Sequence, residues 1–345
     1  MKKPANIMIL VLVLGVGGAA LMIALFARHG FADVSEAVAA AGWGVVAVLA
    51  FHLVPLFFDV LGWQAVLPPE NRLPYLALYK IRWIGDSVSS MLPVAQVGGE
   101  IVRVRLAAAR GVPTPIAAAS VLVGMTVSLV TQIVFTLSGM MVLTFESGTH
   151  NILWPTITAT FVFLCAIAGF FAVQHYGIFR MIGAIIAHLV KGKEWQGLAA
   201  RGATLDQAVR DLYKERRRVF MCCVWTMMVW MTGAVEVYIS LKALGLQGGY
   251  GDAYALESMS QFLRSAAFLV PGALGVQEGG YVVVGGMLGY SPADCMALAL
   301  IRRVRELAFG VPGVLAWQWT EGFAWIKRRS VARAAAAEPA LNKAP

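Results

Sequence analysis

Long apolar runs divide the chain into segments that are each long enough to cross a bilayer. Hydrophobic residues dominate from Ile7 to Phe26, from about Val38 to Leu67, from Pro115 to Phe145, from Ile152 to Val173, from Val219 to about Leu244, and from Ser291 to about Trp319. About 20 apolar residues suffice for a helix to cross the hydrocarbon core. The pattern therefore predicts an all-α integral membrane protein with about six transmembrane helices.

Two further segments are too polar to face lipid along their whole length. The segments from Tyr75 to Leu92 and from Tyr254 to Val270 each contain charged residues and several serines. Each leads to a proline that is followed seven positions later by a glutamate, from Pro93 to Glu100 and from Pro271 to Glu278. A proline removes backbone hydrogen bonds from a helix, and in hydrocarbon such a break is tolerated only inside protein or beside water. The two segments therefore predict re-entrant hairpins built from broken helices.

The two breaks supply the first group of candidate functional residues. An ionisable residue at membrane depth is costly and usually functional. Small residues and prolines are common in membrane helices, which would explain the glycines but not two glutamates together with two polar arms. We expect substrate binding or translocation to involve Pro93, Gly98, Gly99, Glu100, Arg103, Pro271, Gly272, Gly275, Gln277 and Glu278.

The last apolar run contains three arginines within four positions. These are Arg302, Arg303 and Arg305, and Glu306 follows them. One arginine near a boundary can reach the interface by snorkelling, but three so closely spaced point in different directions from a helix. We therefore expect some of them to face inward, where their donor geometry suits a phosphate or another polar headgroup.

Acidic residues elsewhere in the chain are expected to offset these arginines. Glu278, Glu100 or Glu236 is expected to be the partner, and Arg264 in the second polar arm joins the candidate set. Glu257, in the same arm, is expected nearer the outer surface.

Polar residues also interrupt the second apolar run. His52 and Pro55 indicate a proline kink with a polar group near a helix end, and Asp59 is expected to face the protein interior.

Composition excludes a soluble protein. The chain is 59% hydrophobic and 14% charged, with a mean hydropathy of +0.71. The net charge of +9 does not indicate a nucleic-acid partner, because basic residues concentrate in alternate loops and only Arg28 and Lys242 fall in outer ones. Under the positive-inside rule, this asymmetry places both termini on the cytoplasmic side of the membrane.

The same asymmetry predicts the domain organisation. The hairpins enter from opposite sides, so the halves around 68–145 and 250–320 form an inverted repeat, an arrangement found in many transporters. We expect one membrane domain over 1–325, with a cytoplasmic amphipathic connector at 175–218 and a cytoplasmic tail at 326–345.

No motif indicates catalysis, a cofactor or a metal. The sequence contains no zinc-protease, nucleotide-binding or serine-hydrolase motif. The four cysteines lie in or beside apolar runs without ligand spacing. We therefore expect a protein that is not an enzyme and that uses no cofactor.

The motifs resemble those of a known family. The two Pro-to-Glu motifs, Arg103 and the basic cluster of the last helix look like the transmembrane region of lysylphosphatidylglycerol synthases, the flippase-like domain family, over roughly Ile7 to Trp319. Leu92 to Arg103 and Val123 to Gln132 look most similar to the hopanoid-biosynthesis-associated subgroup. The resemblance implies an inner-membrane protein that moves or handles a lipid such as a hopanoid. One departure is Gly124, where the resemblance implies an acidic residue.

Three functional hypotheses follow. The first is a lipid translocase or lipid-export component, in which the hairpin tips admit the headgroup. The second is an integral-membrane enzyme that modifies a lipid headgroup, with Glu278 or Glu100 as acid or base. The third is a non-transporting scaffold for lipid-biosynthesis or export proteins. The aminoacyltransferase domain of the synthases has no counterpart in this sequence, so lysine transfer to lipid is not expected.

Overall fold

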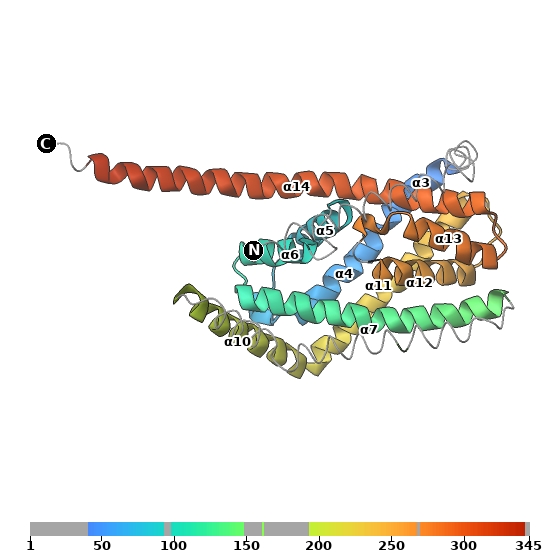
Figure 1. Cartoon of the computed structure of the whole chain (residues 1–345), viewed down its shortest axis with the longest axis horizontal. Coiled ribbons are helices and arrows are strands. Elements are labelled where there is room, and N and C mark those ends of the chain that lie inside the picture. The colour runs from blue at the N-terminus through green and yellow to red at the C-terminus, as the bar shows by residue number, and fades with distance from the viewer. Residues whose placement is uncertain (1–40, 93–97, 148–160, 162–192, 268–269, 342–345) are drawn as a thin grey trace.

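The computed structural model describes residues 41–92, 98–147, 161, 193–267 and 270–341, and the regular structure in these ranges is helical (Figure 1). The fold class predicted from the apolar runs is therefore confirmed. The predicted runs at 7–26 and 152–173, together with Pro93, lie outside the described residues.

Three described segments are long and apolar enough to cross a membrane: Trp43–Val66, Thr114–Glu146 and Arg216–Ala243. They correspond to α3 (Trp43–Phe51) with α4 (Leu53–Val66), to α7 (Thr114–Ser147) and to α11 (Arg216–Ala243). Helices α7 and α11 begin and end within a few residues of the predicted limits, because the apolar runs end at charged or turn-forming residues.

The first of these segments is broken at His52, the residue between α3 and α4. Pro55 lies in the first turn of α4, where its missing N–H cannot bond the carbonyl group four residues earlier. The structure thus divides the segment three residues before this proline, and His52 itself keeps α-helical backbone angles.

The last helix, α14, extends from Pro292 to Leu341 and is 50 residues long. It begins where the sequence predicts but continues well beyond Trp319, the expected end of the span. Its far end projects past the other described helices (Figure 1).

The two predicted hairpins are pairs of packed helices. Helix α5 (Tyr75–Met91) packs against α6 (Gly98–Ala108), and α12 (Tyr250–Ala266) packs against α13 (Val276–Met287). A single-turn 3-10 helix, η3 (Pro271–Ala273), lies between the members of the second pair. Entry of the two pairs from opposite sides of a membrane remains a prediction.

The long helices exchange partners between the two pairs. Helix α14, which follows the second pair, packs along α5, whereas α7, which follows the first pair, packs along α12. Each contact includes a side-chain N–H bonded to a backbone carbonyl group: Trp83 Nε1 donates to Phe309 at 3.0 Å, and Gln132 Nε2 donates to Gln261 at 2.9 Å. Each helix pair is therefore packed against the long helix that follows the other pair.

Glycines allow the closest helix contacts. A Cβ atom on Gly99 of α6 would overlap the carbonyl oxygen of Gly85 and the hydroxyl group of Ser89 on α5. Similar overlaps occur between the long helices and the opposite pair, at Gly139 with Ser258 and at Gly313 with Ser87.

Gly99→Ala is expected to destabilise the protein by about 1–3 kcal/mol, because the helices must separate to admit the methyl group. Gly124→Ala is the matched control, since a Cβ there meets no atom within 4 Å. The apparent melting temperature in detergent measures both effects. Equal melting temperatures for the two variants would show that the α5–α6 contact is not tight.

Helix α10 (Lys193–Lys214) packs against α7. Val209 and Leu212 of α10 share an apolar cluster with Val123 and Val127 of α7. This helix forms most of the described part of the predicted amphipathic connector at 175–218, and residues 175–192 of the connector lie outside the described residues.

The orientation of the chain is testable by cysteine labelling. Cysteines placed at Gly148 and Gly249 should react with an impermeant thiol reagent added outside intact cells, because these positions fall in the predicted outer loops. A cysteine at Gly197 should react only after the cells are opened. Labelling of Gly197→Cys in intact cells would contradict the inverted repeat.

Candidate functional site

The second helix break is formed by residues 270–275, between α12 and α13. Gly272 and Gly275 have positive φ angles of 60° and 76°, in the left-handed region that glycine adopts without strain. Helix α13 then begins, and Glu278 is its third residue. The Glu278 Oε2 atom accepts the backbone N–H of Gly275 at 2.8 Å, which satisfies a free donor at the positive end of the helix.

Arg303 fastens this break to α14. Its Nε donates to Glu278 Oε1 at 2.6 Å, and its NH1 donates to the carbonyl oxygen of Gly272 at 2.9 Å and to Glu306. Glu278 is only 1% exposed. The predicted pairing of Glu278 with an arginine of the last helix is therefore present, and Arg303 is the partner.

The remaining arginines reach other helices. Arg302 NH1 donates to Glu257 Oε2 on α12 at 2.5 Å and to the Tyr281 hydroxyl oxygen on α13 at 3.0 Å. Arg305 pairs with Glu236 on α11. Arg302 and Arg305 are both buried, as expected for inward-facing cations.

Glu257 is 3% exposed and paired with Arg302. Its expected depth, nearer the outer surface of the membrane, stays a prediction. A further pair joins Arg264 on α12 to Glu306 on α14 at 2.8 Å. Charges so buried are tolerated because each is paired, and removing one partner of such a pair leaves an uncompensated charge.

A second ionic cluster lies at the first hairpin and centres on Arg82 of α5. Arg82 Nε lies 2.5 Å from Asp59 Oδ2 on α4 and 3.3 Å from Asp86 Oδ2, and its NH1 lies 3.6 Å from Glu100 Oε1 on α6. Asp59 therefore faces the protein interior, as expected. Glu100 is the third residue of α6, the place that Glu278 occupies in α13.

Arg103 completes this cluster. Its NH1 donates to Glu100 Oε2 at 2.6 Å, and its guanidinium carbon lies 4.6 Å from the ring centroid of Trp63. Glu100 thus pairs with arginines of its own hairpin, whereas Glu278 and Glu236, the other two partners that the sequence offered, pair with the α14 arginines. The buried Arg103 is held by both a charge and an aromatic face.

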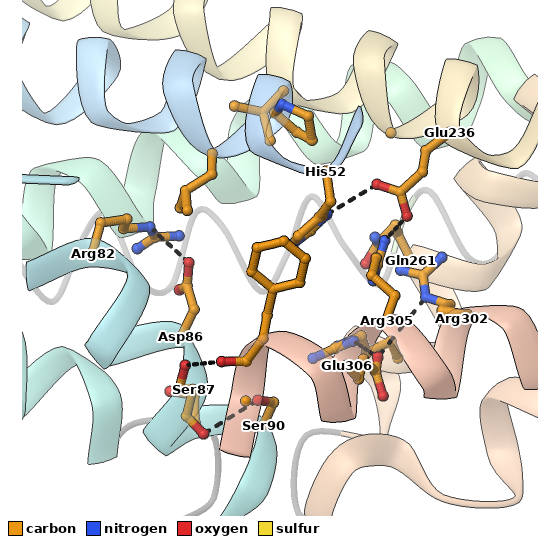
Figure 2. Close-up of a pocket in the computed structure, with 18 of the residues that line it drawn as sticks. His52, Arg82, Asp86, Ser87, Ser90, Glu236, Gln261, Arg302, Arg305 and Glu306 are labelled. Atoms are coloured by element: carbon orange, nitrogen blue, oxygen red, sulfur yellow. Dashed lines mark hydrogen bonds and ion pairs between the residues drawn. The ribbon is translucent and has the colours of Figure 1, made fainter. Parts of the chain in front are cut away.

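A cavity of about 380 Å³ lies between the two clusters. Figure 2 shows Arg82 and Asp86 on one side of it and Glu236, Arg302 and Arg305 on the other. This volume falls within the range of roughly 300–1,000 Å³ that is usual for small-molecule sites. Each lining arginine is paired with a carboxylate group, so the wall offers hydrogen-bond donors and acceptors together.

A second cavity of about 350 Å³ adjoins the first. Four residues line both, namely Arg82, Glu100, Ser128 and Ser265. Arg103 and Trp63 line only the second cavity, where Gly124 leaves open space. The acidic residue that the family resemblance implies at this position would face this cavity beside Arg103.

The predicted site residues divide by location. Those that line the first cavity are Glu100, Glu236, Arg264, Arg302 and Arg305, and Arg103 lines the second. Gln277, Glu278 and Arg303 line neither; with Gly272 and Gly275 they form or support the second break. Gly98 begins α6, and Gly99 packs against α5. Pro271 begins η3, and Pro93 lies outside the described residues.

The sequence did not assign five charged or titratable wall residues to the site: His52, Arg82, Asp86, Glu257 and Glu306. Three of them, Arg82, Asp86 and Glu257, belong to the two polar arms. The polarity of these arms is visible in the sequence, but it does not show which side chains face the cavity. A helical-wheel comparison of α5 and α12 would have found them, because Arg82 and Asp86 are four residues apart and share a face. Within the described part of the chain, no cluster of His, Cys, Asp or Glu is placed to hold a metal ion.

A known protein family matches most of the chain. No curated protein matches the sequence. The family model described as lysylphosphatidylglycerol synthase TM region matches residues 8–313, which include every residue that lines the two cavities. The chain therefore belongs to the family of the lysylphosphatidylglycerol synthase transmembrane region.

Proposed function

We propose that this membrane protein moves a polar-headed lipid across the bacterial inner membrane without altering it chemically. Family membership supports a membrane protein that deals with lipid. The observation that carries the proposal is the pair of adjoining polar cavities, which share four wall residues inside a bundle of membrane-length helices. A passage through the wall that the two cavities share would give a headgroup a path while the lipid tail stays in the bilayer.

The wall chemistry favours a headgroup that both donates and accepts hydrogen bonds. The arginines of the first cavity are already neutralised by carboxylate groups, so a bare anion would have to displace one of them at a cost. A hopanoid with a polar head is the first substrate to test, on the basis of the resemblance of Leu92 to Arg103 to the hopanoid-associated subgroup.

The test is lipid movement by the purified protein in liposomes. Fluorescently labelled phospholipids and a hopanoid would be placed in one leaflet, and their arrival in the other would be followed by chemical quenching. Mass spectrometry of the recovered lipid would show whether its covalent structure had changed. Unchanged lipid that moves faster than in protein-free liposomes supports the proposal, and modified lipid contradicts it.

Ser128→Phe is expected to slow lipid movement at least about tenfold, because the ring would fill the wall position common to both cavities. No charge is removed, so the ion pairs that hold the fold remain. Val130→Phe is the matched control, since Val130 lies on the same helix but is 40% exposed on its outer side. If both variants slowed lipid movement equally, the route of the headgroup would not run past Ser128.

The second candidate is an enzyme that modifies a lipid headgroup. Glu100 is the observation in its favour, because this carboxylate group lines both cavities. Glu278, the other carboxylate group considered, lines neither cavity and has both oxygens bonded. Partner proteins of lipid biosynthesis or export would act with the protein under either function.

A further inference from the structure

His52 occupies the break between α3 and α4 and lines the first cavity. Its side chain is 26% exposed, and its ring meets that of Phe309 edge to face, with 4.8 Å between the centroids. Of the described residues on the cavity wall, His52 is the only histidine. An imidazole group is the side chain whose unperturbed pKa, about 6.5, allows it to gain a proton near neutral pH.

Glu236 is shared between this ring and an arginine. His52 Nδ1 lies 2.9 Å from Glu236 Oε2, while Arg305 NH1 bonds Glu236 Oε1. With the Nδ1 hydrogen directed to the carboxylate group, Nε2 retains the lone pair that accepts a proton. The three groups come from three separate parts of the bundle: the α3–α4 break, α11 and α14.

The effect of a proton on His52 depends on the charged groups that the neighbouring helices place around its ring. The helices packed against α3 and α4 contribute Glu236 on α11, Arg302, Arg305 and Glu306 on α14, and Arg82 and Asp86 on α5. Asp59, on α4 itself, adds a fourth carboxylate group and faces Arg82. Of these groups, Glu236 bonds the ring directly, and Arg305 bonds the same carboxylate group. A proton on His52 would therefore strengthen its bond to Glu236 and repel Arg305, which holds the other oxygen of the same carboxylate group.

We propose that His52 and Glu236 form a proton-binding site in which the protonated ring competes with Arg305 for Glu236, and that protonation there drives movement of the lipid headgroup. The second half of this proposal rests on the proposed function. Release of Arg305 would loosen α14 from α11, and α14 is the helix that also holds the second break and packs along α5. Proton binding at one site would thus reach both hairpins.

Titration of the full chain tests the proton site without any transport. Histidine labelled with 15N is followed by NMR in lipid nanodiscs between about pH 5 and 8. The chain has five histidines, and His52→Gln identifies the ring signal by its loss. Arg305→Gln should raise the proton affinity of this ring about tenfold, one pH unit, because the competitor is gone. Glu236→Gln should lower it by a similar factor.

Controls keep the titration interpretable. Single variants of a buried pair can fail to fold. The double variant Glu236→Gln/Arg305→Gln removes both charges, so the two opposite effects should cancel and leave the proton affinity of His52 near its wild-type value. Asp252→Asn, whose carboxylate group accepts the Tyr290 hydroxyl at 2.7 Å, should leave the His52 signal unchanged. If the ring does not titrate above about pH 5 in either the wild type or Arg305→Gln, the proposal is wrong.

A transport measurement then tests the coupling. Movement of fluorescent phosphatidylethanolamine by the wild type should change about tenfold over one pH unit imposed across the liposome membrane, and in His52→Gln it should not respond. Movement that ignores pH in the wild type would overturn the coupling while leaving the proposed function intact. A normal titration with no movement of any lipid would instead contradict the proposed function.

Discussion

Arg82→Gln should leave little folded protein. The change removes the cation that faces Asp59, Asp86 and Glu100, and these carboxylate groups come from three helices. Breaking a single buried pair costs on the order of 3–5 kcal/mol, a large part of the roughly 5–15 kcal/mol by which proteins are usually stable. The yield of monodisperse protein on gel filtration, with the melting temperature of any folded fraction, measures the loss.

Lys80→Gln is the control for this prediction. Lys80 lies two residues before Arg82 on α5 and is exposed, so its replacement removes the same charge from the chain without affecting the cluster. Adding Asp59→Asn to Arg82→Gln should restore part of the yield, because the closest stranded carboxylate group is then neutral. Normal yield and melting temperature in Arg82→Gln would show that the three carboxylate groups do not depend on this arginine.

Glu278→Gln should destabilise the protein by on the order of 3–5 kcal/mol. The substitution removes the carboxylate group that holds Arg303 Nε and the Gly275 amide, so the second break loses its tie to α14. Arg303 retains Glu306, which places the effect below that of Arg82→Gln. Thermal unfolding in detergent provides the measurement.

The double variant Glu278→Gln/Arg303→Gln shows whether Glu278 only supports the fold or also contacts the lipid headgroup. Stability should largely return, because no charge is left buried alone. Since neither side chain lines the two cavities, lipid movement should return with it. Recovery of stability without recovery of movement would assign Glu278 a direct role with the headgroup, as the sequence alone suggested.

The sequence predicted the long helices well because lipid-facing helices must be apolar throughout, and this requirement is visible locally. The limits of α7 and α11 are examples. It also indicated that the arginines of the last span face inward, since their spacing on a helix cannot serve one interface.

The ion-pair partners could not be predicted in the same way. Glu257 and Arg302 are 45 residues apart in sequence, and their contact depends on where α12 crosses α14. Polarity within α5 likewise showed that the arm was unusual but not that Arg82 would join three carboxylate groups. Crossing points are set by contacts such as Gly313 with Ser87, which no local pattern reveals.

The length of α14 means that a small tilt near its arginines moves its far end a long way. Fifty residues extend about 75 Å, whereas the hydrocarbon core is about 30 Å thick. Its buried arginines lie near one end, and roughly 54 Å of helix follows Arg305 as far as Leu341. A tilt of about 10° at the arginines would swing the far end by roughly 9 Å over that length. A distance probe placed at this end would therefore detect rearrangements of the ion pairs that are too small to resolve where they occur.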